Sequence, residues 1–286
     1  MLKRTVKNLY NHIPFTHLLG IQPVYFKGVV INKEQILTAI KKNGYVVLSV
    51  KTNLLRGPGL NGAGYWSNGP HPFVRWLEQA QHTGNWSYDG SLLEYYYKNF
   101  PETASDRLGL PKNRKRAKLD ALGPFSVCFP WDGGFGSGQE QRYLKQRFNE
   151  MASHEVACDL SGSNTNELDP VSDNVGRWHA QRLQSIFNSI SENDYRVERS
   201  KNHIRASLLF SGSVLMASVV RSGHHRSAAL AALGVEEIPL LVKRGEIVMR
   251  EDVDIWPAVK SGDITREDAL FVFDRVAAGQ ASVTLG

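Results

Sequence analysis

A strand, a glycine turn, a helix and a second strand follow one another near the end of the chain, and this pattern constrains the fold most. The apolar run 213–220 predicts the first strand. Helix formers at 227–233, closed by Gly234 where a left-handed cap belongs, predict the helix. The apolar run 238–242 predicts a second, buried strand. The residues behind Gly223 therefore stand at a helix N-terminus, where backbone N–H groups have no partner inside the helix.

This turn has the composition of an anion-binding site. A helix N-terminus attracts negative charge through its unpaired N–H groups and its dipole. Arg226 adds a guanidinium whose geometry matches a phosphate, and His224 and His225 add two imidazoles. We therefore predict a receptor of phosphate size; the alternative is a structural helix start whose side chains pair with carboxylates elsewhere. No metal site is predicted, because neighbouring histidines point in different directions and no HExxH or CxxC pattern accompanies them.

The same residues carry a resemblance to a known family. The box Ser-Gly-His-His-Arg-Ser-Ala-Ala at 222–229, with Leu-Gly and Ile-Pro behind it, resembles the signature of the ParB/sulfiredoxin superfamily. Upstream, the helical pattern 182–190 and a first strand that begins with Asp194 resemble the family less specifically. The resemblance covers residues 169–242 and implies that the turn holds nucleotide phosphates. The residues that it implies for nucleotide binding are Ser222, Gly223, His224, His225, Arg226 and Ser227.

Two branches of this superfamily do not fit the chain. Sulfiredoxins place a nucleophilic cysteine between the glycine and the histidine, where this chain has His224, and its two cysteines are Cys128 and Cys158. ParB proteins need a helix-turn-helix domain behind the box, but only the short segment 243–286 follows. The remaining branch binds ATP or a similar nucleotide and hydrolyses it or transfers a phosphoryl group.

The resemblance therefore implies ATP or another nucleoside triphosphate with Mg²⁺ as cofactors, and an unidentified small molecule as acceptor. Phosphoryl transfer relies on electrostatic stabilisation, so the N–H groups behind Gly223 and the Arg226 side chain are expected to hold the phosphates. A carboxylate must accept the proton of the attacking hydroxyl, and the candidates Glu198, Asp194 and Asp169 stay unranked. The catalytic residues that we expect are His224, His225, Glu198 and Asp194. Further positive charge is expected from Arg196, Arg199 and Lys201.

The charge of the chain favours anionic partners. Its net charge is +6 and its pI is about 9.2, which suits nucleotides, nucleic acid or lipid headgroups alike. Much of the excess lies in the run 112–118, which predicts a solvated loop, with a nucleic-acid patch as the alternative. No aromatic residue interleaves with this run, so binding of single-stranded nucleic acid is disfavoured.

The N-terminus and the cysteine content bear on location. Lys3, Arg4 and Lys7 alternate with apolar residues, which predicts a solvated extension, with peripheral membrane contact as the alternative. No apolar stretch reaches the roughly 20 residues of a membrane span, and no signal peptide is predicted. Two cysteines give no disulfide framework, which is typical of a reducing cytoplasm.

We divide the chain into three segments. The first, 1–122, is rich in aromatic residues and turns, and its role is open, acceptor binding included. It predicts helices at 34–42, 73–81 and 91–99 and a strand at 45–50. Between them, the glycine-rich stretch 53–72 predicts a long loop, either a lid that closes Tyr65 and Trp66 over a ligand or a surface excursion.

The second segment, 123–168, is a connector. It predicts a strand at 125–129, a glycine-rich loop at 130–138 and a helix from Gln139 to about 151. Glutamine at 139 breaks the dinucleotide fingerprint, so we interpret the loop as a connector or substrate loop rather than a phosphate cradle.

The third segment, 169–286, contains the box. It predicts a helix at 175–190 before the box and another that Thr265 opens as N-cap. Leu270, Phe273 and Ala277 lie at helical spacing there and are expected to bury one face. The pair Asp252 and Asp254 matches the metal-binding Asp-x-Asp of glycosyltransferases, a pattern that chance produces easily.

These observations predict an α+β protein, and the resemblance implies a C-terminal ParB/sulfiredoxin-like domain with an N-terminal aromatic- and loop-rich α/β segment packed on it. Its predicted function is nucleotide binding with phosphoryl transfer or hydrolysis, as in a small-molecule kinase or ATPase. Two alternatives remain, a nucleic-acid-binding protein of the same fold and a nucleotide-binding regulator without turnover.

Overall fold

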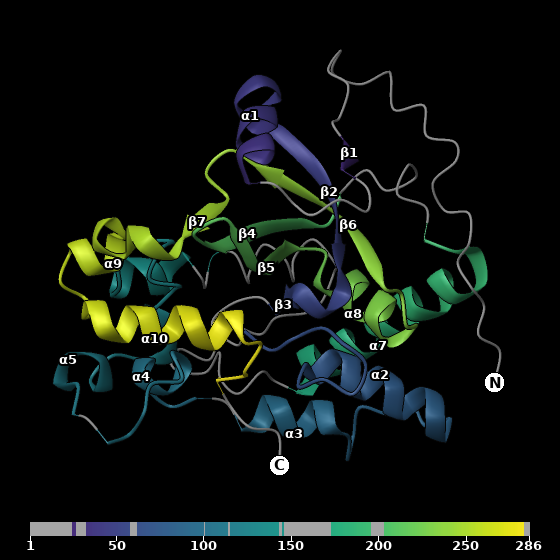
Figure 1. Cartoon of the computed structure of the whole chain (residues 1–286). Coiled ribbons are helices and arrows are strands. Elements are labelled where there is room, and N and C mark those ends of the chain that lie inside the picture. Colours follow the sequence, from purple (N-terminus) through teal and green to yellow (C-terminus); the bar gives the residue numbers. More distant parts are fainter. Residues whose placement is uncertain are drawn as a thin grey trace.

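The computed structural model describes residues 25–26, 33–57, 62–99, 101–113, 115–142, 145, 173–195 and 203–282. Over these residues the protein is an α+β structure, a mixed sheet with helices on both faces (Figure 1). The strands are β1 (Tyr25–Phe26), β2 (Tyr45–Lys51), β3 (Leu55–Arg56), β4 (Arg205–Ser211), β5 (Val214–Ser222), β6 (Glu237–Lys243) and β7 (Ile247–Met249). The α-helices are α1 (Lys33–Asn43), α2 (Pro72–Thr83), α3 (Leu92–Lys98), α4 (Ala104–Arg107), α5 (Ala117–Asp120), α7 (Asp173–Asn193), α8 (His224–Ala232), α9 (Pro257–Lys260) and α10 (Arg266–Ala277). Short 3₁₀ turns are η1 (Thr52–Leu54), η3 (Pro124–Ser126) and η5 (Arg250–Ile255).

The sheet joins segments that lie far apart in the sequence. Its strand order is β1-β2-β6-β4-β5-β3, and β7 pairs with β4 beside this path. Strand β2 runs antiparallel to β6 from the pair Tyr45 and Lys243 to the pair Lys51 and Glu237. The first segment (1–122) and the third (169–286) therefore contribute strands to the same sheet.

Both faces of the central strands are buried. Leu208 and Leu209 of β4 point to opposite faces, and both are 0% exposed. Leu208 belongs to the core under α2, α3, α7 and α8, and Leu209 belongs to the core under α4, α9 and α10. Figure 1 shows these helix groups on different sides of the strands. A strand buried on both faces is an almost continuous apolar run rather than an alternating one.

Helix α8 sits deep in the first of these cores. Ala228, Ala229 and Ala231 are at most 2% exposed, and small side chains let the helix approach β5, α2 and α7 closely. The helix ends as predicted, since Gly234 has a φ of 73° and its N–H donates to the carbonyl of Ala231. The position of α8 is thus fixed by packing on several sides.

The stretch 53–72 is neither a lid nor a surface excursion over its described residues. Ala63 and Tyr65 are 0% exposed and His71 is 2% exposed, so the chain here crosses the interior. The Trp66 ring lies so close to Gly64, Gly69 and Gly279 that a Cβ at any of them meets it within 3 Å. The glycines of this stretch therefore leave room for the indole of Trp66 to pack against the backbone, and they do not make the chain a mobile lid.

Arg56 ties this stretch to the end of α10. Its Nε donates to the carbonyls of Val276 (2.9 Å) and Ala277 (3.2 Å), and its Nη2 donates to Ala277 (2.6 Å). Its Nη1 donates to the carbonyl of Asn53 (2.7 Å), and the guanidinium lies 5.4 Å from the Trp66 ring centre. The side chain caps carbonyls that a helix leaves unpaired at its C-terminus. Burial lowers the pKa of Arg56 to about 10, so the cap stays charged at neutral pH.

Most of the predicted elements are confirmed with small changes of boundary. The confirmed elements are α1, β2, α2, α3, α7, β5, α8, β6 and α10. Thr265 accepts the N–H of Asp268 at the start of α10, and Phe273 and Ala277 are buried as expected, while Leu270 is half-buried. The helix predicted from Gln139 begins at 137, and its remainder lies largely outside the described residues.

Two strand predictions are wrong. The apolar stretch 125–129 forms the turn η3 and then irregular chain, although Phe125, Val127 and Phe129 are buried. The side chains of Val127 and Phe129 fill the core around α10, and no strand pairs with the backbone of 125–129 among the described residues. Asp194 does not begin a strand but follows the end of α7 with a φ of 59°.

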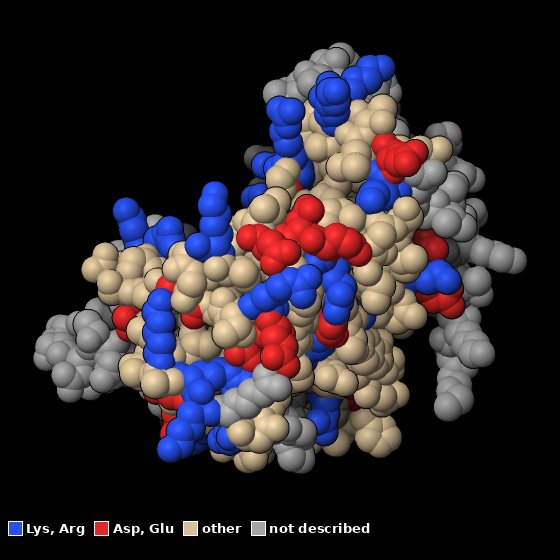
Figure 2. Space-filling view, turned by 60° about the vertical axis from the view of Figure 1, so that its left-hand side comes forward, with Lys and Arg blue, Asp and Glu red and all other residues tan. Residues whose placement is uncertain are grey.

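The basic run 112–118 is not a plain solvated loop. Arg116 is 9% exposed in its side chain and holds both carboxylate oxygens of Asp268, with Nε–Oδ2 at 2.9 Å and Nη2–Oδ1 at 2.7 Å. Lys118 pairs with Asp263 at 2.6 Å. Acidic and basic side chains lie side by side over the face shown in Figure 2. The run therefore offers less free positive charge to nucleic acid than the sequence suggested.

No helix within the described parts of the chain has the length and apolar character needed to cross a membrane.

Replacing Arg56 by methionine is expected to lower the free energy of unfolding by about 2 kcal/mol or more, because buried carbonyls lose their donor. Urea unfolding of the two proteins measures the difference. The matched control is Arg266→Met, which breaks an exposed pair with Asp254 and should change the free energy of unfolding by less than about 1 kcal/mol. An equal loss in both variants would contradict the capping role of Arg56.

Candidate anion-binding site

The site begins where β5 turns into α8. Gly223 has a φ of 86°, a left-handed conformation that favours glycine. A Cβ at this position meets Cγ1 of Ile204 at 2.9 Å and Nη2 of Arg226 at 3.1 Å, so a larger residue does not fit. As N-cap residue, Gly223 has no side chain to accept the N–H groups of the first turn of α8. No N-cap side chain therefore occupies these donors.

His224 is the first residue of α8 and has an unusual environment. Its ring is partly exposed, but its Nδ1 is shielded from solvent and has no hydrogen-bond partner among the described residues. Burial, helped by the positive charges of Arg221 and Arg226, lowers the pKa of His224 to about 4. The imidazole is therefore neutral at pH 7.

The next residue, His225, is directed into the core. It is 8% exposed, and its Nε2 lies 3.0 Å from Nδ1 of His179 on α7. The ring also stacks on Phe73 of α2 at 5.4 Å, and Tyr97 of α3 stacks on His179 at 5.8 Å. One ring of such a pair donates while the other accepts, which suits two neutral imidazoles. The geometry makes His225 a packing residue rather than a ligand for an exposed anion.

A further histidine completes this cluster from the N-terminal segment. His71 is the N-cap of α2, and its Nδ1 accepts the backbone N–H of Phe73 at 3.2 Å. Its ring stacks on Tyr65 at 3.9 Å. Burial, with the nearby His224 and His225, holds the pKa of His71 well below its usual range. His71 and His179 were not predicted, because nothing in the local sequence marks them as neighbours of the turn.

Arg226 lies beside the turn, and the two serines flank it. The guanidinium approaches Gly223 closely enough to limit its side chain, and its charge adds to burial in lowering the pKa of His203. Ser222 is half-buried at the end of β5, opposite Arg205. Ser227 is 0% exposed, so its hydroxyl lies inside the protein. Of the six residues predicted for nucleotide binding, His225 and Ser227 are thus buried, and the others are half-buried.

An arginine that the sequence analysis did not single out stands beside them. Arg221 donates from Nε to Oγ of Ser207 at 2.7 Å, from Nη1 to Oδ2 of Asp132 at 2.5 Å and from Nη2 to Oδ1 of Asp132 at 2.7 Å. Asp132 belongs to the glycine-rich loop 130–138, so this loop lies next to the turn. The pair was not predictable locally, because 89 residues separate its members.

The glycine-rich loop itself is not a phosphate cradle over its described residues. The N–H of Phe135 donates to Oδ2 of Asp263 at 3.0 Å, and the N–H of Gly136 donates to the carbonyl of Ser126 at 2.7 Å. Trp131 stacks on Phe129 with ring centres 4.7 Å apart. The loop thus uses these donors internally and is anchored in the core, which agrees with a connector.

Of the predicted carboxylates, the structure describes Asp194, and it is not brought to the turn. Asp194 is exposed and follows α7, about 22 Å along the helix axis from His179, since each helical residue advances the axis by 1.5 Å. His179 touches His225 at the start of α8, so Asp194 lies outside the reach of a ligand bound there. Outside the described residues lie Glu198, Asp169, Arg196, Arg199 and Lys201.

The Asp-x-Asp pair does not form a metal site in this structure. Both residues lie in η5, where Asp254 pairs with Arg266 at 3.0 Å and Val253 between them is buried. Within the described part of the chain, no three histidine, cysteine, aspartate or glutamate side chains gather in a way that suits a metal ion.

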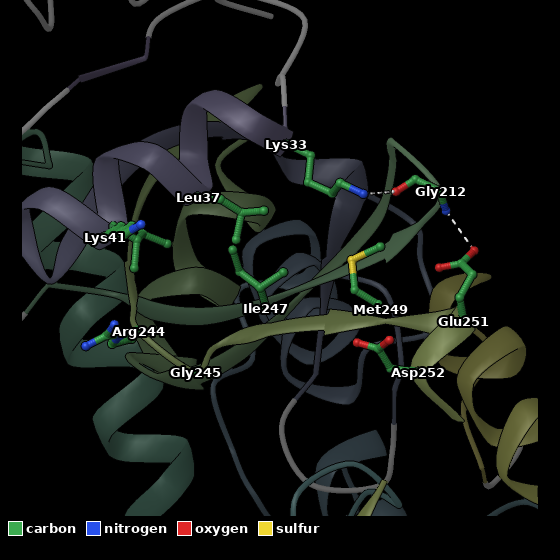
Figure 3. A pocket seen from close by; sticks show the side chains of 11 residues that line it. Lys33, Leu37, Lys41, Gly212, Arg244, Gly245, Ile247, Met249, Glu251 and Asp252 are labelled. Atoms are coloured by element: carbon green, nitrogen blue, oxygen red, sulfur yellow. Dashed lines mark hydrogen bonds between the residues drawn. The ribbon is translucent and has the colours of Figure 1, made fainter. Parts of the chain in front are cut away.

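A separate hollow of about 760 Å³ lies between α1 and β7 (Figure 3). Its middle is apolar, with Leu37 of α1 above Ile247 and Met249 of β7. Glu251 closes one end by accepting the N–H of Gly212 at 2.8 Å. None of the residues at the start of α8 lines this hollow, so it is distinct from the candidate anion site.

Comparison of the chain with models of protein families, with curated proteins and with solved structures gives no match.

The histidine cluster predicts that the protein loses stability at mildly acidic pH. A histidine whose pKa is lower in the folded than in the unfolded chain binds more protons when unfolded, so the free energy of unfolding falls as the pH falls between the two values. For His224 this window runs from the ordinary value of 6.5 down to about 4. Each such histidine contributes up to about 1.4 kcal/mol per pH unit within its window.

Urea unfolding between about pH 7.5 and pH 5 measures this slope. His224→Asn is expected to reduce the slope of the free energy of unfolding against pH by the contribution of one histidine. His82→Asn changes an exposed histidine of α2 and should keep the slope of the wild type. A slope that His224→Asn leaves unchanged would show that His224 is not held neutral in the folded protein.

Proposed function

We propose that the protein binds a nucleoside triphosphate by its phosphates at the start of α8 and transfers or hydrolyses a phosphoryl group. The observation that carries this proposal is the buried Nδ1 of His224, which has no hydrogen-bond partner among the described residues and stands in a first turn without an N-cap side chain, where the charges of Arg221 and Arg226 act on it. Preorganised N–H donors and fixed positive charges are what phosphate recognition requires. The C-terminal part then belongs to the ParB/sulfiredoxin-like fold that the signature box resembles.

The chain's own groups supply binding and charge stabilisation in this mechanism. The N–H groups behind Gly223 hold the phosphate oxygens, and Arg226 adds a charge-assisted hydrogen bond. His224 is neutral at pH 7, so its ring takes part through an uncharged hydrogen bond and adds no further positive charge. Since His225 is directed toward His179, its part is to hold α8 in place.

The residues at the turn also fit a nucleotide that carries Mg²⁺. Such an ion is held mainly by the substrate phosphates and one or two carboxylates, and it neutralises charge that develops on the transferred group. Asp132 is a carboxylate that the structure brings to this end of β5, and each oxygen keeps a second lone pair beside its bond to Arg221. The acceptor is proposed to be a small molecule.

Binding without turnover is the second candidate. It is favoured by the positions of His225, which is directed into the core, and Asp194, which lies at the far end of α7. A nucleotide regulator needs the phosphate site but no base. Release of inorganic phosphate distinguishes the two functions once binding is established.

Thermal unfolding with ATP, CTP, GTP and ADP, each with and without Mg²⁺, tests the proposal. A nucleotide at about 100 times its Kd raises the free energy of unfolding by about 2.7 kcal/mol, which is easily visible. Arg226→Ala is expected to abolish the shift, because it removes a charged donor beside the turn.

Arg266→Ala is the control, since its exposed side chain pairs with Asp254 on η5. Full nucleotide affinity in Arg226→Ala would contradict the site. The absence of any nucleotide shift in the wild type, together with salt-sensitive binding of DNA or RNA that Lys112→Ala and Lys115→Ala weaken, would favour the nucleic-acid alternative.

A further inference from the structure

Arg221 is held in one orientation by three groups that come from two other parts of the chain. Its Nε is bound to Ser207 of β4, and its two Nη atoms are bound to the two carboxylate oxygens of Asp132, all within 2.7 Å. The guanidinium also lies 5.7 Å from the centre of the Phe129 ring. A guanidinium has five N–H donors, so these contacts leave two of them for another acceptor.

The backbone is shaped to present this side chain. In the β4–β5 pair, Arg205 is opposite Ser222 and Ala206 is opposite Val220, so Arg221 is the extra residue of a β-bulge. Bulges re-aim a side chain at the end of a strand and are frequent beside active sites. Here the bulge directs Arg221 toward Ser207 and Phe129, on the face of the sheet opposite α8.

Arg221 nevertheless lies close to the start of α8 along the chain. It is followed by Ser222 and Gly223, and Nη2 of Arg226 lies beside the same glycine, 3.1 Å from the position of a Cβ at residue 223. The two faces of the sheet thus meet at the end of β5. Arg226 and the first turn of α8 lie on one side of this edge, and Arg221 with Asp132 lies on the other.

We propose that Arg221 is a second phosphate-binding arginine of this site, that Asp132 and Ser207 position it, and that the ligand is therefore a diphosphate or triphosphate rather than a monophosphate. The inference rests on the proposed function, because it uses the same turn. One phosphoryl group occupies the N–H groups of α8 and Arg226. A second, linked phosphoryl group then lies across the edge of the sheet at Arg221.

The pair with Asp132 is better explained by positioning than by stability. The Arg221 and Asp132 side chains are 26% and 27% exposed, and ion pairs that solvent reaches contribute little to the free energy of unfolding. An arginine that is already fixed loses less conformational freedom on binding a phosphate. Asp132 also balances the charge of Arg221 when no anion is bound.

Isothermal titration calorimetry with AMP, ADP, ATP and inorganic pyrophosphate tests this inference on the full chain. The wild type is expected to bind ADP, ATP and pyrophosphate well and AMP weakly. Arg221→Ala should weaken the affinity for ATP and pyrophosphate by about 10- to 100-fold, which corresponds to the loss of a hydrogen bond to a charged group. The affinity for AMP should change little. Arg221→Lys should recover only part of the affinity, because a point charge replaces a fork.

Asp132→Asn tests the positioning role. This variant is expected to weaken the affinity for pyrophosphate less than Arg221→Ala does and to make the entropy of binding more unfavourable. Asp132→Glu should restore part of the lost affinity. The matched control is Arg250→Ala, which breaks another bidentate pair, with both bonds to Asp274 at 2.8 Å, away from the turn. Arg250→Ala should leave every affinity unchanged, and thermal unfolding without ligand shows that each variant folds.

The outcomes separate the two proposals. ATP binding that Arg226→Ala abolishes and Arg221→Ala leaves intact would overturn the role of Arg221 while the proposed function stands. Pyrophosphate binding that depends on Arg221, without any preference for a nucleotide, would support this inference and overturn the nucleotide assignment. Equal affinity for AMP and ADP would overturn the assignment of a linked second phosphate. A wild type that binds none of the probes would overturn both.

Discussion

The way in which the chain leaves β5 determines the arrangement of everything around the candidate site. A bulge at Arg221 and a left-handed glycine at 223 reverse the backbone within three residues, and α8 begins at once. Because Ala228 and Ala229 bring α8 into close contact with the sheet, the helix cannot shift to relieve a larger residue at Gly223. The same tight connection leaves the first-turn N–H groups without a side-chain cap. The close packing of α8 and the proposed anion recognition therefore depend on the same turn.

Burial of both sheet faces explains why the site is assembled from distant segments. With helices on each side, ligand-accessible backbone is concentrated at strand ends, as in other layered sheets. At the end of β5 the layer that contains α8 meets the layer that contains the Asp132 loop. Asp132 contacts Arg221, and His179 contacts His225, from opposite sides of this edge. Each contact fixes a side chain that the turn alone would leave free to move.

Local chemistry in the sequence was enough to predict many of the helices and strands and the turn at Gly223. Gly223, the alanines of α8, Gly234 and the Thr265 cap act through neighbouring residues, so their meaning can be read without tertiary structure. The predictions failed where a distant partner decides the outcome. Residues 125–129 have a strand-like pattern but no partner strand among the described residues, and the glycines around Trp66 make room for one ring rather than for motion. The partner of Arg221 is 89 residues away and that of His225 is 46 residues away.

At the candidate site the arginines are charged at neutral pH and the histidines are not. Burial lowers the pKa of both His224 and His71, the charges of Arg221 and Arg226 lower that of His224 further, and His224 and His225 lower that of His71, so both imidazoles are held neutral at pH 7. Protonating them would add positive charge to a region that already has it and would cost folding free energy. Arginine keeps its charge under these conditions, because its ordinary pKa is far above neutrality. Positive charge for an anion therefore comes from groups that do not titrate near pH 7, while the histidines supply shape, stacking and uncharged hydrogen bonds.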